Sequence, residues 1–344
     1  MRLLICTQIV DSQDSNLGFF HRWIEEFARH CEKVTVICLT EGAHVFPGNV
    51  KVLSLGKEAG TSKVTRAIRF WKYIYQERDT YDAVFVHMNP EYVLLGGFLW
   101  KRWGKKVGLW YAHKSVTRKL KRAVSLVDRV FTVSEDSFGL HSPKVTPVGH
   151  GIDTDLFNPT LHLESTATRI LTVGRVAESK HLIEMLEMLD TMEARGERFT
   201  FTIVGIPTSE AEEAYAQRLY DEAKTKLYSD RIRFLGSVPH HELPALLNTH
   251  DLALNFSTTG NMDKAGLEAL AVGIPLFTTN QAFEALLEPY GLYTPTMAGE
   301  TAAGVLMKFL NRSDRPSIVA TLRNRVAAEH SLKNLIPKIL AGLS

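Results

Sequence analysis

Short apolar runs rich in Val, Ile and Leu alternate with segments whose apolar residues recur at helical spacing. In the first part of the chain, strands are expected at 3–8, 34–39, 50–55, 81–88, 106–113 and 129–134, and helices at 18–31, 62–76, 92–103 and 118–127. Continuous apolar strands separated by helices are typical of a parallel sheet that is covered on both faces. The pattern therefore predicts an α/β protein with a doubly wound, Rossmann-like sheet.

A turn-rich stretch at 157–167 separates this series from a second one with the same rhythm. Strands are expected here at 169–174, 199–205, 231–236, 252–257 and 274–279, and helices at 181–196, 211–227, 241–250 and 266–273. A chain of 344 residues is long enough for two cores, and we place the domains at 1–160 and 161–330. Ligands of such sheets bind beyond the carboxyl ends of the strands, so the residues that follow the strands of the second series are expected to carry the chemistry.

The composition, with 45% hydrophobic and 23% charged residues, is that of an ordinary globular protein. No apolar run approaches the roughly 18 residues that a membrane span needs, and the first apolar run is too short for a cleavable signal. We therefore expect a cytoplasmic protein. Cys6, Cys31 and Cys38 have no metal-ligand spacing and are expected to be buried free thiols.

Charge is divided unevenly along the chain, although the net charge is only +2. Residues 1–160 hold 22 Lys and Arg against 16 Asp and Glu, and the remaining residues hold 18 against 22. The basic first part is expected to meet an anionic partner, such as a lipid surface or an acidic acceptor. The ordinary interpretation of its segments 63–72 and 113–122 is a solvated helix face with its aromatic residues in the core, and the alternative is peripheral contact with anionic headgroups.

Two cations follow the first strand of the second series. Gly174 and Arg175 come directly after that strand, and Lys180 precedes the next expected helix. Phosphate groups bind at such places because backbone amides and cations converge on them. The segment lacks the second Gly and the Ser or Thr of a P-loop, so taken alone it fits solvated surface charge better than a phosphate site.

Further motifs follow in a fixed order, namely RFLGSVP at 233–239 and TTGNMDKAGLEALAVGIP at 258–275. With the segment around Arg175 and Lys180, this ordered set resembles the retaining family 4 glycosyltransferases of the two-Rossmann-domain (GT-B) type. The segment HGIDTDLFNP at 150–159 is similar to the Asn-Gly-Ile-Asp segment that precedes the hinge in that family. The resemblance covers nearly the whole chain.

The resemblance implies two Rossmann-like domains that face each other across a cleft. It implies a hinge near 156–168 whose closure excludes water, and a carboxy-terminal helix within 331–344 that returns to the first domain. A sugar is then transferred from a nucleoside-diphosphate sugar, most readily one linked to UDP or GDP. The acceptor is a glycan, a lipid-linked sugar or a small molecule, and the anomeric configuration is retained.

The same resemblance assigns the donor contacts. Arg175 and Lys180 hold the diphosphate, Glu268 bonds the ribose, and residues around Val238 lie beside the base. Elementary chemistry agrees with this assignment, because breaking a glycosyl–phosphate bond builds negative charge on the leaving diphosphate, which fixed cations stabilise without a metal. A carboxylate accepts hydrogen bonds only, which suits a pair of ribose hydroxyls.

The sequence departs from the family where the family usually has a Glu eight positions before Glu268, because Gly260 stands there. Asp263 occupies a position where the family usually has Gly. We expect Asp263, with the backbone amides of Gly260, Asn261, Met262 and Asp263 and the neighbouring Lys264, to contact the hydroxyls of the donor sugar. The start of the helix at these residues suits such contacts because its first amides have no partner within the helix.

The first domain offers weaker candidates. His113 follows a strand where the family has a His in the cleft, so it is a candidate catalytic residue that touches the reacting sugar, and its alternative is a capping or packing role. His87 ends another strand and is a candidate for lining the cleft. Gly18 resembles the family's glycine loop near the donor, although a turn glycine without a ligand fits the pattern as well. His21 and Glu135 are candidates for the acceptor side.

Other patterns point away from metals and redox cofactors. Asp153 and Asp155 imitate an Asp-x-Asp metal motif, but they stand just before the linker. No Gly-x-Gly-x-x-Gly follows the first strand, and the thirteen histidines show no zinc-binding spacing. We therefore expect no metal and no cofactor. Two alternatives stay open: a sugar-nucleotide epimerase on the same plan, and a non-catalytic module that binds nucleotide sugars.

Overall fold

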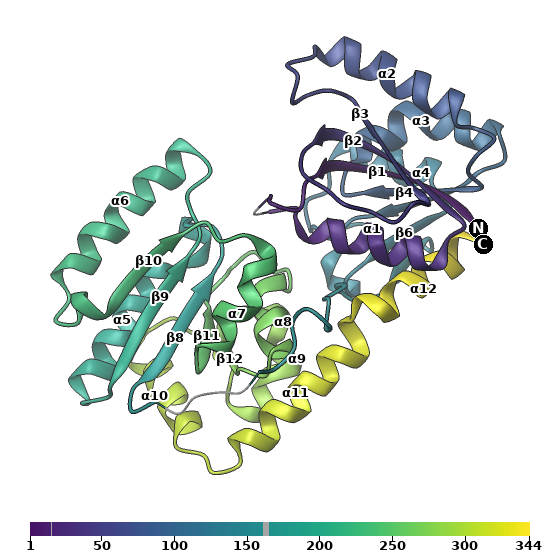
Figure 1. The fold of residues 1–344 in the computed structure, drawn as a ribbon. Helices are drawn as coiled ribbons and strands as arrows, with labels where there is room; N and C mark the ends of the chain where they lie inside the picture. Colours follow the sequence, from purple (N-terminus) through teal and green to yellow (C-terminus); the bar gives the residue numbers. More distant parts are fainter. Residues whose placement is uncertain (15, 161–164) are drawn as a thin grey trace. The chain divides into compact units, whose positions relative to one another are not determined.

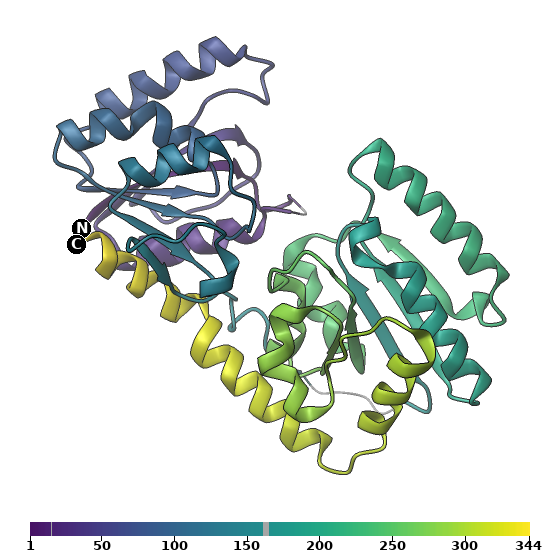
Figure 2. The same cartoon turned by 180° about the vertical axis from the view of Figure 1, so that it is seen from behind.

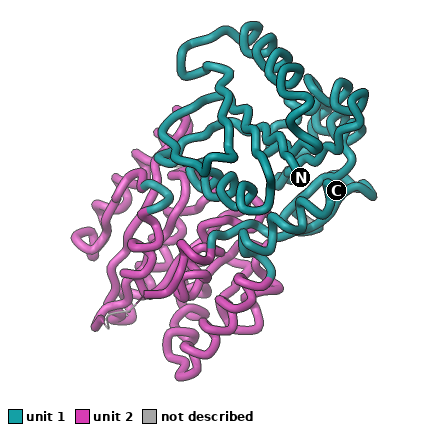
Figure 3. The backbone as a smooth tube through the Cα atoms, turned by 45° about the vertical axis from the view of Figure 1, so that its right-hand side comes forward, with its two compact units in different colours: residues 1–153, 239–241, 329–344 teal, residues 154–238, 242–328 magenta. Residues whose placement is uncertain are grey.

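The computed structural model describes residues 1–14, 16–160 and 165–344, which form two compact units (Figure 3). Unit 1 comprises Met1–Asp153, Pro239–His241 and Glu329–Ser344, and unit 2 comprises Thr154–Val238 and Glu242–Ala328. The change of unit after Asp153 precedes the boundary that we placed after residue 160. Residues 161–164 of the expected hinge lie outside the described residues.

The sheet of unit 1 is parallel and runs in the order β3-β2-β1-β4-β5-β6-β7 (Figure 1). From β1 the chain proceeds to one edge of the sheet, then crosses to β4 and proceeds to the other edge. The strands are β1 Arg2–Val10, β2 Lys33–Glu41, β3 Val50–Ser54, β4 Ala83–His87, β5 Lys106–Trp110, β6 Arg129–Thr132 and β7 Val145–Pro147.

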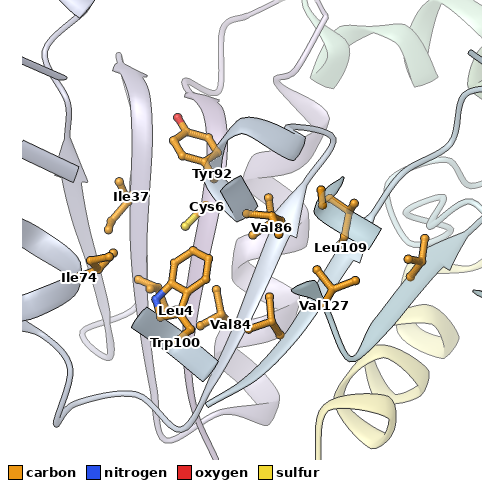
Figure 4. Close-up of a cluster of buried hydrophobic side chains, with 14 of the residues drawn as sticks. Leu4, Cys6, Ile37, Ile74, Val84, Val86, Tyr92, Trp100, Leu109 and Val127 are labelled. Carbon is orange, nitrogen blue, oxygen red and sulfur yellow. The ribbon is translucent and has the colours of Figure 1, made fainter. Parts of the chain in front are cut away.

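Alternate residues of each strand point to opposite sides of this sheet. Since apolar side chains lie on both sides, helices cover both faces. Val84 and Val86 of β4 join a buried cluster with α2, α3 and α4, which includes the large side chains of Trp100 and Tyr92 (Figure 4). Phe85 lies between them in sequence and packs on the other face, its ring 5.1 Å from that of Phe27 in α1. The helices are α1 Phe19–His30, α2 Lys63–Gln76, α3 Pro90–Arg102, α4 Arg118–Leu126 and α12 Leu332–Leu343.

Local sequence explains where these helices begin. Ser62 caps α2 by accepting a hydrogen bond from the Thr65 amide, and Thr117 caps α4 by accepting one from the Leu120 amide. Pro90 opens α3, where its missing N–H has no partner to lose. The carboxy-terminal α12 packs against α1, β5 and β6 of unit 1, with the two chain ends close together (Figure 1).

The sheet of unit 2 is also parallel, in the order β10-β9-β8-β11-β12. Its strands are β8 Thr168–Val173, β9 Phe199–Val204, β10 Ile232–Gly236, β11 Leu252–Asn255 and β12 Leu276–Thr278. Its helices are α5 Leu182–Ala194, α6 Glu210–Thr225, α7 Leu243–Asn248, α8 Lys264–Ala271, α9 Glu284–Leu287, α10 Gly299–Leu310 and α11 Arg315–His330. α5 packs against α6 and α10, and α8 packs against β11 and β12; Figure 2 shows these layers from behind.

The two doubly wound sheets confirm the fold predicted from the sequence. Cys6, Cys31 and Cys38 are buried and form no disulfide, as expected. None of the helices in the described parts of the chain combines the length and apolar character needed to cross a bilayer. Helices α10 and α11 were not assigned from the sequence.

Candidate donor site

The candidate residues of unit 2 gather where the strand order of its sheet reverses. β8 and β11 are neighbours there, and the chain leaves them toward opposite edges of the sheet. Loops that follow two such strands diverge and leave a crevice, which is the usual ligand position in open α/β sheets. Arg175 and Lys180 follow β8, and residues 256–263 follow β11. The two segments are joined by a hydrogen bond from the Thr258 amide to the Ser179 carbonyl at 3.2 Å.

The backbones that follow β8 and β9 approach each other so closely that Gly205 has no room for a side chain. The Gly205 backbone has a φ of +134°, and a Cβ added there would lie 1.8 Å from the Gly174 carbonyl oxygen. Gly174 in turn lies against the aliphatic chain of Lys180, whose Cε would be 3.5 Å from an added Cβ. The glycines that end these strands therefore bring the backbone before Arg175 into a fixed position beside Lys180.

Lys180 and Asp263 form an ion pair at this edge of the sheet. The Lys180 ammonium donates to Asp263 Oδ2 at 2.7 Å, and it lies 3.4 Å from the Ser257 hydroxyl. Asn255, the last residue of β11, donates its side-chain amide to the same Asp263 oxygen at 2.7 Å. The side chains of Lys180 and Asp263 are 16% and 17% exposed. The pair is thus partly withdrawn from water, which strengthens its electrostatic interaction.

Arg175 is half exposed and is held by a second carboxylate. Its guanidinium donates to Glu212 near the start of α6. Glu212 also accepts hydrogen bonds from the Thr208 amide at 2.7 Å and from the Thr208 hydroxyl at 2.6 Å. Burial tends to raise the pKa of Glu212, but the hydrogen bonds from Thr208 and the nearby Arg175 outweigh it and lower the pKa. Both predicted cations therefore have carboxylate partners that fix their positions.

The loop after β11 carries polar groups just before the start of α8. Gly260 takes a φ of +68°, and Asp263 is the residue that precedes α8. The Asn261 carbonyl accepts a hydrogen bond from the Asn280 side chain at 2.8 Å. Asn261 Oδ1 is buried and has no hydrogen-bond partner among the described residues. A buried acceptor of this kind is costly unless something donates to it.

The other donor-site candidates occupy neighbouring elements of unit 2. Glu268 is 3% exposed and lies one turn into α8, which begins at Lys264. Met262 and Lys264 flank Asp263 and are both half-buried. Val238 lies two residues after β10, also half-buried.

In unit 1, Gly18 precedes α1 and adopts an ordinary helical φ of −54°. A Cβ there would lie 2.4 Å from the Asp14 carbonyl oxygen, so the requirement for Gly is the close approach of the backbone. His21 is in α1, where its ring stacks on Phe46 and accepts a hydrogen bond from the Val45 amide at 3.3 Å. Burial lowers the pKa of His21, with Glu25 opposing the shift. His21 is therefore anchored by packing.

The remaining candidates of unit 1 differ in burial. His87 ends β4, is 3% exposed and stacks on Phe20 at a ring distance of 4.1 Å. His113 lies in the exposed loop after β5, where its Nδ1 accepts a hydrogen bond from the Ser115 amide at 2.9 Å. Glu135 is exposed in a short helical turn after β6. His87 thus packs in an aromatic cluster of unit 1, whereas His113 and Glu135 have exposed side chains.

Several residues of the donor site were not found from the sequence. Asn255 and Asn280 each follow or end a strand, so the rule that ligands bind at carboxyl ends could have indicated them. Glu212 is the fourth residue of the pattern Ser209-x-x-Glu212, which signals a helix start. That signal does not reveal that Glu212 accepts from Arg175, because the contact joins separate elements.

No cluster of three or more His, Cys, Asp or Glu side chains that could hold a metal occurs within residues 1–14, 16–160 and 165–344. Asp153 of the Asp-x-Asp motif instead accepts a hydrogen bond from the Arg22 guanidinium at 2.6 Å, so it anchors α1.

Comparison with known sequences locates a family match in unit 2. Residues 155–286 match the family described as "Glycosyl transferases group 1". The putative colanic acid biosynthesis glycosyltransferase WcaL of Salmonella typhimurium is 26% identical over 219 residues, which are 60% of this chain and 52% of WcaL. The amylovoran biosynthesis glycosyltransferase AmsK of Erwinia amylovora is 26% identical over 56% of this chain and 49% of AmsK. The chain thus spans about half the length of these curated relatives.

Comparison with solved structures covers the whole chain. HepE from Anabaena, solved in complex with UDP and glucose, superposes with a TM-score of 0.76 at 16% identity and covers 100% of this chain and 99% of HepE. WaaG, a glycosyltransferase involved in lipopolysaccharide biosynthesis, gives a TM-score of 0.68 at 14% identity over 99% of each chain. At these identities the similarity establishes the fold, which is GT-B with two Rossmann-like domains.

Proposed function

We propose that this protein transfers a sugar from a nucleoside-diphosphate sugar to an acceptor. The proposal starts from the GT-B fold of the chain and from the match of residues 155–286 to the glycosyl transferases group 1 family. The observation that carries the proposal is the Lys180–Asp263 ion pair, at 2.7 Å, where β8 and β11 diverge. Cations at this position suit a diphosphate, and polar groups beside them suit a sugar.

In the proposed mechanism, Arg175 and Lys180 stabilise the diphosphate as the glycosyl–phosphate bond breaks. Negative charge on the leaving oxygen increases in the transition state, so fixed cations contribute more there than in the ground state. The acceptor hydroxyl attacks the face from which the diphosphate leaves, and the departing phosphate oxygen takes its proton. The anomeric configuration is then retained without a metal. Before the donor arrives, the carboxylates of Glu212 and Asp263 pair with these cations.

We assign the donor sugar to the loop 260–263 and the ribose to Glu268. Asp263 supplies acceptor oxygens beside Lys180, and the buried Asn261 Oδ1 gains a partner when a ligand hydroxyl donates to it. Glu268 is buried on α8, close in sequence to this loop. We likewise assign Val238 to a contact with the base. The bound UDP and glucose named for HepE make UDP-glucose the first donor to assay, followed by GDP-linked sugars.

We also propose that unit 1 contacts the inner face of a membrane through α2 and α3. Val64, Ile68, Trp71 and Tyr75 recur at helical spacing on α2 and are 44–69% exposed, and Phe98 of α3 is 74% exposed. The ordinary interpretation of the sequence is that the aromatic residues of this segment lie in the core. It holds for Phe70 but not for Trp71 and Tyr75. An apolar stripe on a basic helix suits an anionic lipid surface. Failure to sediment with anionic vesicles at low salt would remove this proposal.

The test is a reaction of the full chain with a panel of nucleoside-diphosphate sugars and acceptors, followed by nuclear magnetic resonance. The proposal predicts release of the nucleoside diphosphate together with a glycoside whose anomeric configuration equals that of the donor. An isomerised sugar nucleotide without glycoside would identify an epimerase. Donor binding without turnover over the acceptor panel would identify a non-catalytic module, and an inverted glycoside would refute the retaining mechanism.

A further inference from the structure

Unit 1 contains a cavity of about 400 Å³ at the carboxyl end of its sheet. Gln8 of β1, Leu39 of β2 and Asn89 after β4 line it, and α2 and α3 supply the opposite wall. β1 and β4 are the strands between which the order of this sheet reverses. The cavity therefore occupies, in unit 1, the position at which open α/β sheets bind their ligands. Its volume falls in the range of small-molecule sites.

Most of the cavity wall is apolar. Its large side chains are Phe70 of α2, Tyr92 and Leu95 of α3, and Leu55 after β3. The Tyr92 hydroxyl donates to the Thr7 carbonyl at 3.0 Å, so the ring is held in place and its polar end is already satisfied. A ligand that fills this space must bring an apolar part, because an apolar group gains free energy on leaving water for these surfaces, whereas a polar group would lose its hydrogen bonds to water there.

Three cations lie around the same cavity. Lys57, Lys63 and Arg66 line it, and none of them forms an ion pair with another described residue. One carboxylate, Glu91, also lines it, and this carboxylate is engaged by Lys119 at 2.9 Å. The charge left for a ligand is therefore positive, in an otherwise apolar pocket. A ligand with an anionic group and an apolar chain matches both features.

Polar groups at the strand ends add a fixed contact. Gln8 donates its side-chain amide to Asn89 Oδ1 at 2.9 Å, across the two strands at the reversal. Met88, just before Asn89, has a φ of +60°, a strained value for a residue other than Gly. Strained backbone of this kind persists only where the surrounding structure holds it, and such positions cluster at functional sites.

We propose that this cavity binds a phosphate-bearing amphiphile, with the phosphate at Lys57, Lys63 and Arg66 and the apolar chain between α2, α3 and the strand ends. The binding of this amphiphile does not depend on the transfer activity proposed above. Its role as the sugar acceptor rests on that activity. The acceptor class is then a sugar linked through phosphate to a lipid, with a hydroxyl of that sugar as the attacking group.

The test is isothermal titration of the full chain with decyl phosphate below its micellar concentration. We expect binding of one molecule per chain, with no detectable binding of inorganic phosphate or of decyl maltoside. Equal binding of decyl maltoside would mean that the charge is irrelevant, and equal binding of inorganic phosphate would mean that the apolar wall is irrelevant. Either result, or no binding of decyl phosphate, overturns the proposal.

Variants of α2 locate the site. Lys63→Glu with Arg66→Glu should weaken decyl phosphate by about tenfold or more, because charge-assisted contacts to phosphate are lost. Lys72→Glu is the matched control, since Lys72 is exposed on the same helix and does not line the cavity. It should change the affinity less than about twofold. Ala67→Trp, which fills the cavity, should abolish binding; because it can also disturb folding, the charge variants carry the test.

Titration of UDP into the same samples separates this proposal from the donor site. The Lys63→Glu, Arg66→Glu variant can retain UDP binding and bind decyl phosphate with unchanged affinity. That result overturns the cavity assignment and leaves the donor-site assignment intact. Binding of both ligands without transfer of sugar to any phosphate-bearing acceptor overturns the acceptor assignment and leaves the cavity as a binding site.

Discussion

Asp263→Asn separates the sugar contact that we assign to this residue from the diphosphate contact that we assign to Lys180. The variant keeps the size of the side chain and removes the charge that faces Lys180 at 2.7 Å. Since the two side chains are 16% and 17% exposed, the pair falls between exposed and buried ion pairs. Its loss should destabilise unit 2 by about 2 kcal/mol.

Binding of two ligands gives the informative comparison. UDP should bind Asp263→Asn as tightly as the native protein or more tightly, because Asp263 no longer competes for the Lys180 ammonium. UDP-glucose should lose the hydrogen bonds that its hydroxyls donate to the carboxylate. A hydrogen bond to a charged group contributes about 1.5–3 kcal/mol, so the affinity for UDP-glucose relative to UDP should fall about ten- to hundredfold. Isothermal titration of both ligands at one salt concentration measures this ratio.

Asp251→Asn is the matched control. Asp251 pairs with Arg169 at 2.9 Å, with side chains 26% and 24% exposed, at the amino ends of β11 and β8. The variant should lower stability by a similar amount and leave the UDP-glucose to UDP ratio unchanged. An unchanged ratio in Asp263→Asn would refute the sugar contact. An equal change in Asp251→Asn would show that the effect comes from general loss of stability.

Two further predictions concern stability. Gly205→Ala should lower the free energy of unfolding in urea by about 3 kcal/mol or more, because its Cβ would meet the Gly174 carbonyl at 1.8 Å. Gly196→Ala, with open space around it, should lower it by only about 1–2 kcal/mol. Equal losses in the two variants would refute the close approach. Burial lowers the pKa of His250 below its ordinary value of 6.5, so the folded state binds fewer protons than the unfolded one and stability should fall as the pH drops below about 6.5. His250→Asn should flatten this slope in unfolding measured from pH 8 to 5, and an unchanged slope would exclude His250 as its source.

The parallel sheets could be predicted because the continuous apolar runs that mark their strands are local features of the sequence. The runs at 3–8 and 169–174 lie within β1 and around β8, and each is apolar on both faces because helices cover both sides. The helix at 315–330 was missed. Its apolar residues Ile318, Leu322 and Val326 are buried, but charged residues are spread around the rest of the helix and weaken the pattern.

The donor site was predictable in part. Lys180 and Asp263 were both named from the sequence, yet their ion pair joins loops more than eighty residues apart and depends on β8 and β11 being neighbours. The partner of Arg175 was missed for the same reason, because Glu212 belongs to the start of another helix. Sequence motifs locate such residues at strand ends, whereas the topology decides which ends meet.

The central claim is that Arg175 and Lys180 bind the diphosphate of the donor, and the most direct measurement is UDP affinity in an Arg175→Ala, Lys180→Ala double variant. Loss of two charge-assisted contacts should weaken UDP by about a hundredfold or more, whereas Lys308→Ala, which removes an exposed cation of α10, should change it less than about twofold. If the double variant binds UDP and GDP as the native protein does, the diphosphate site lies elsewhere and the proposed function loses its structural basis.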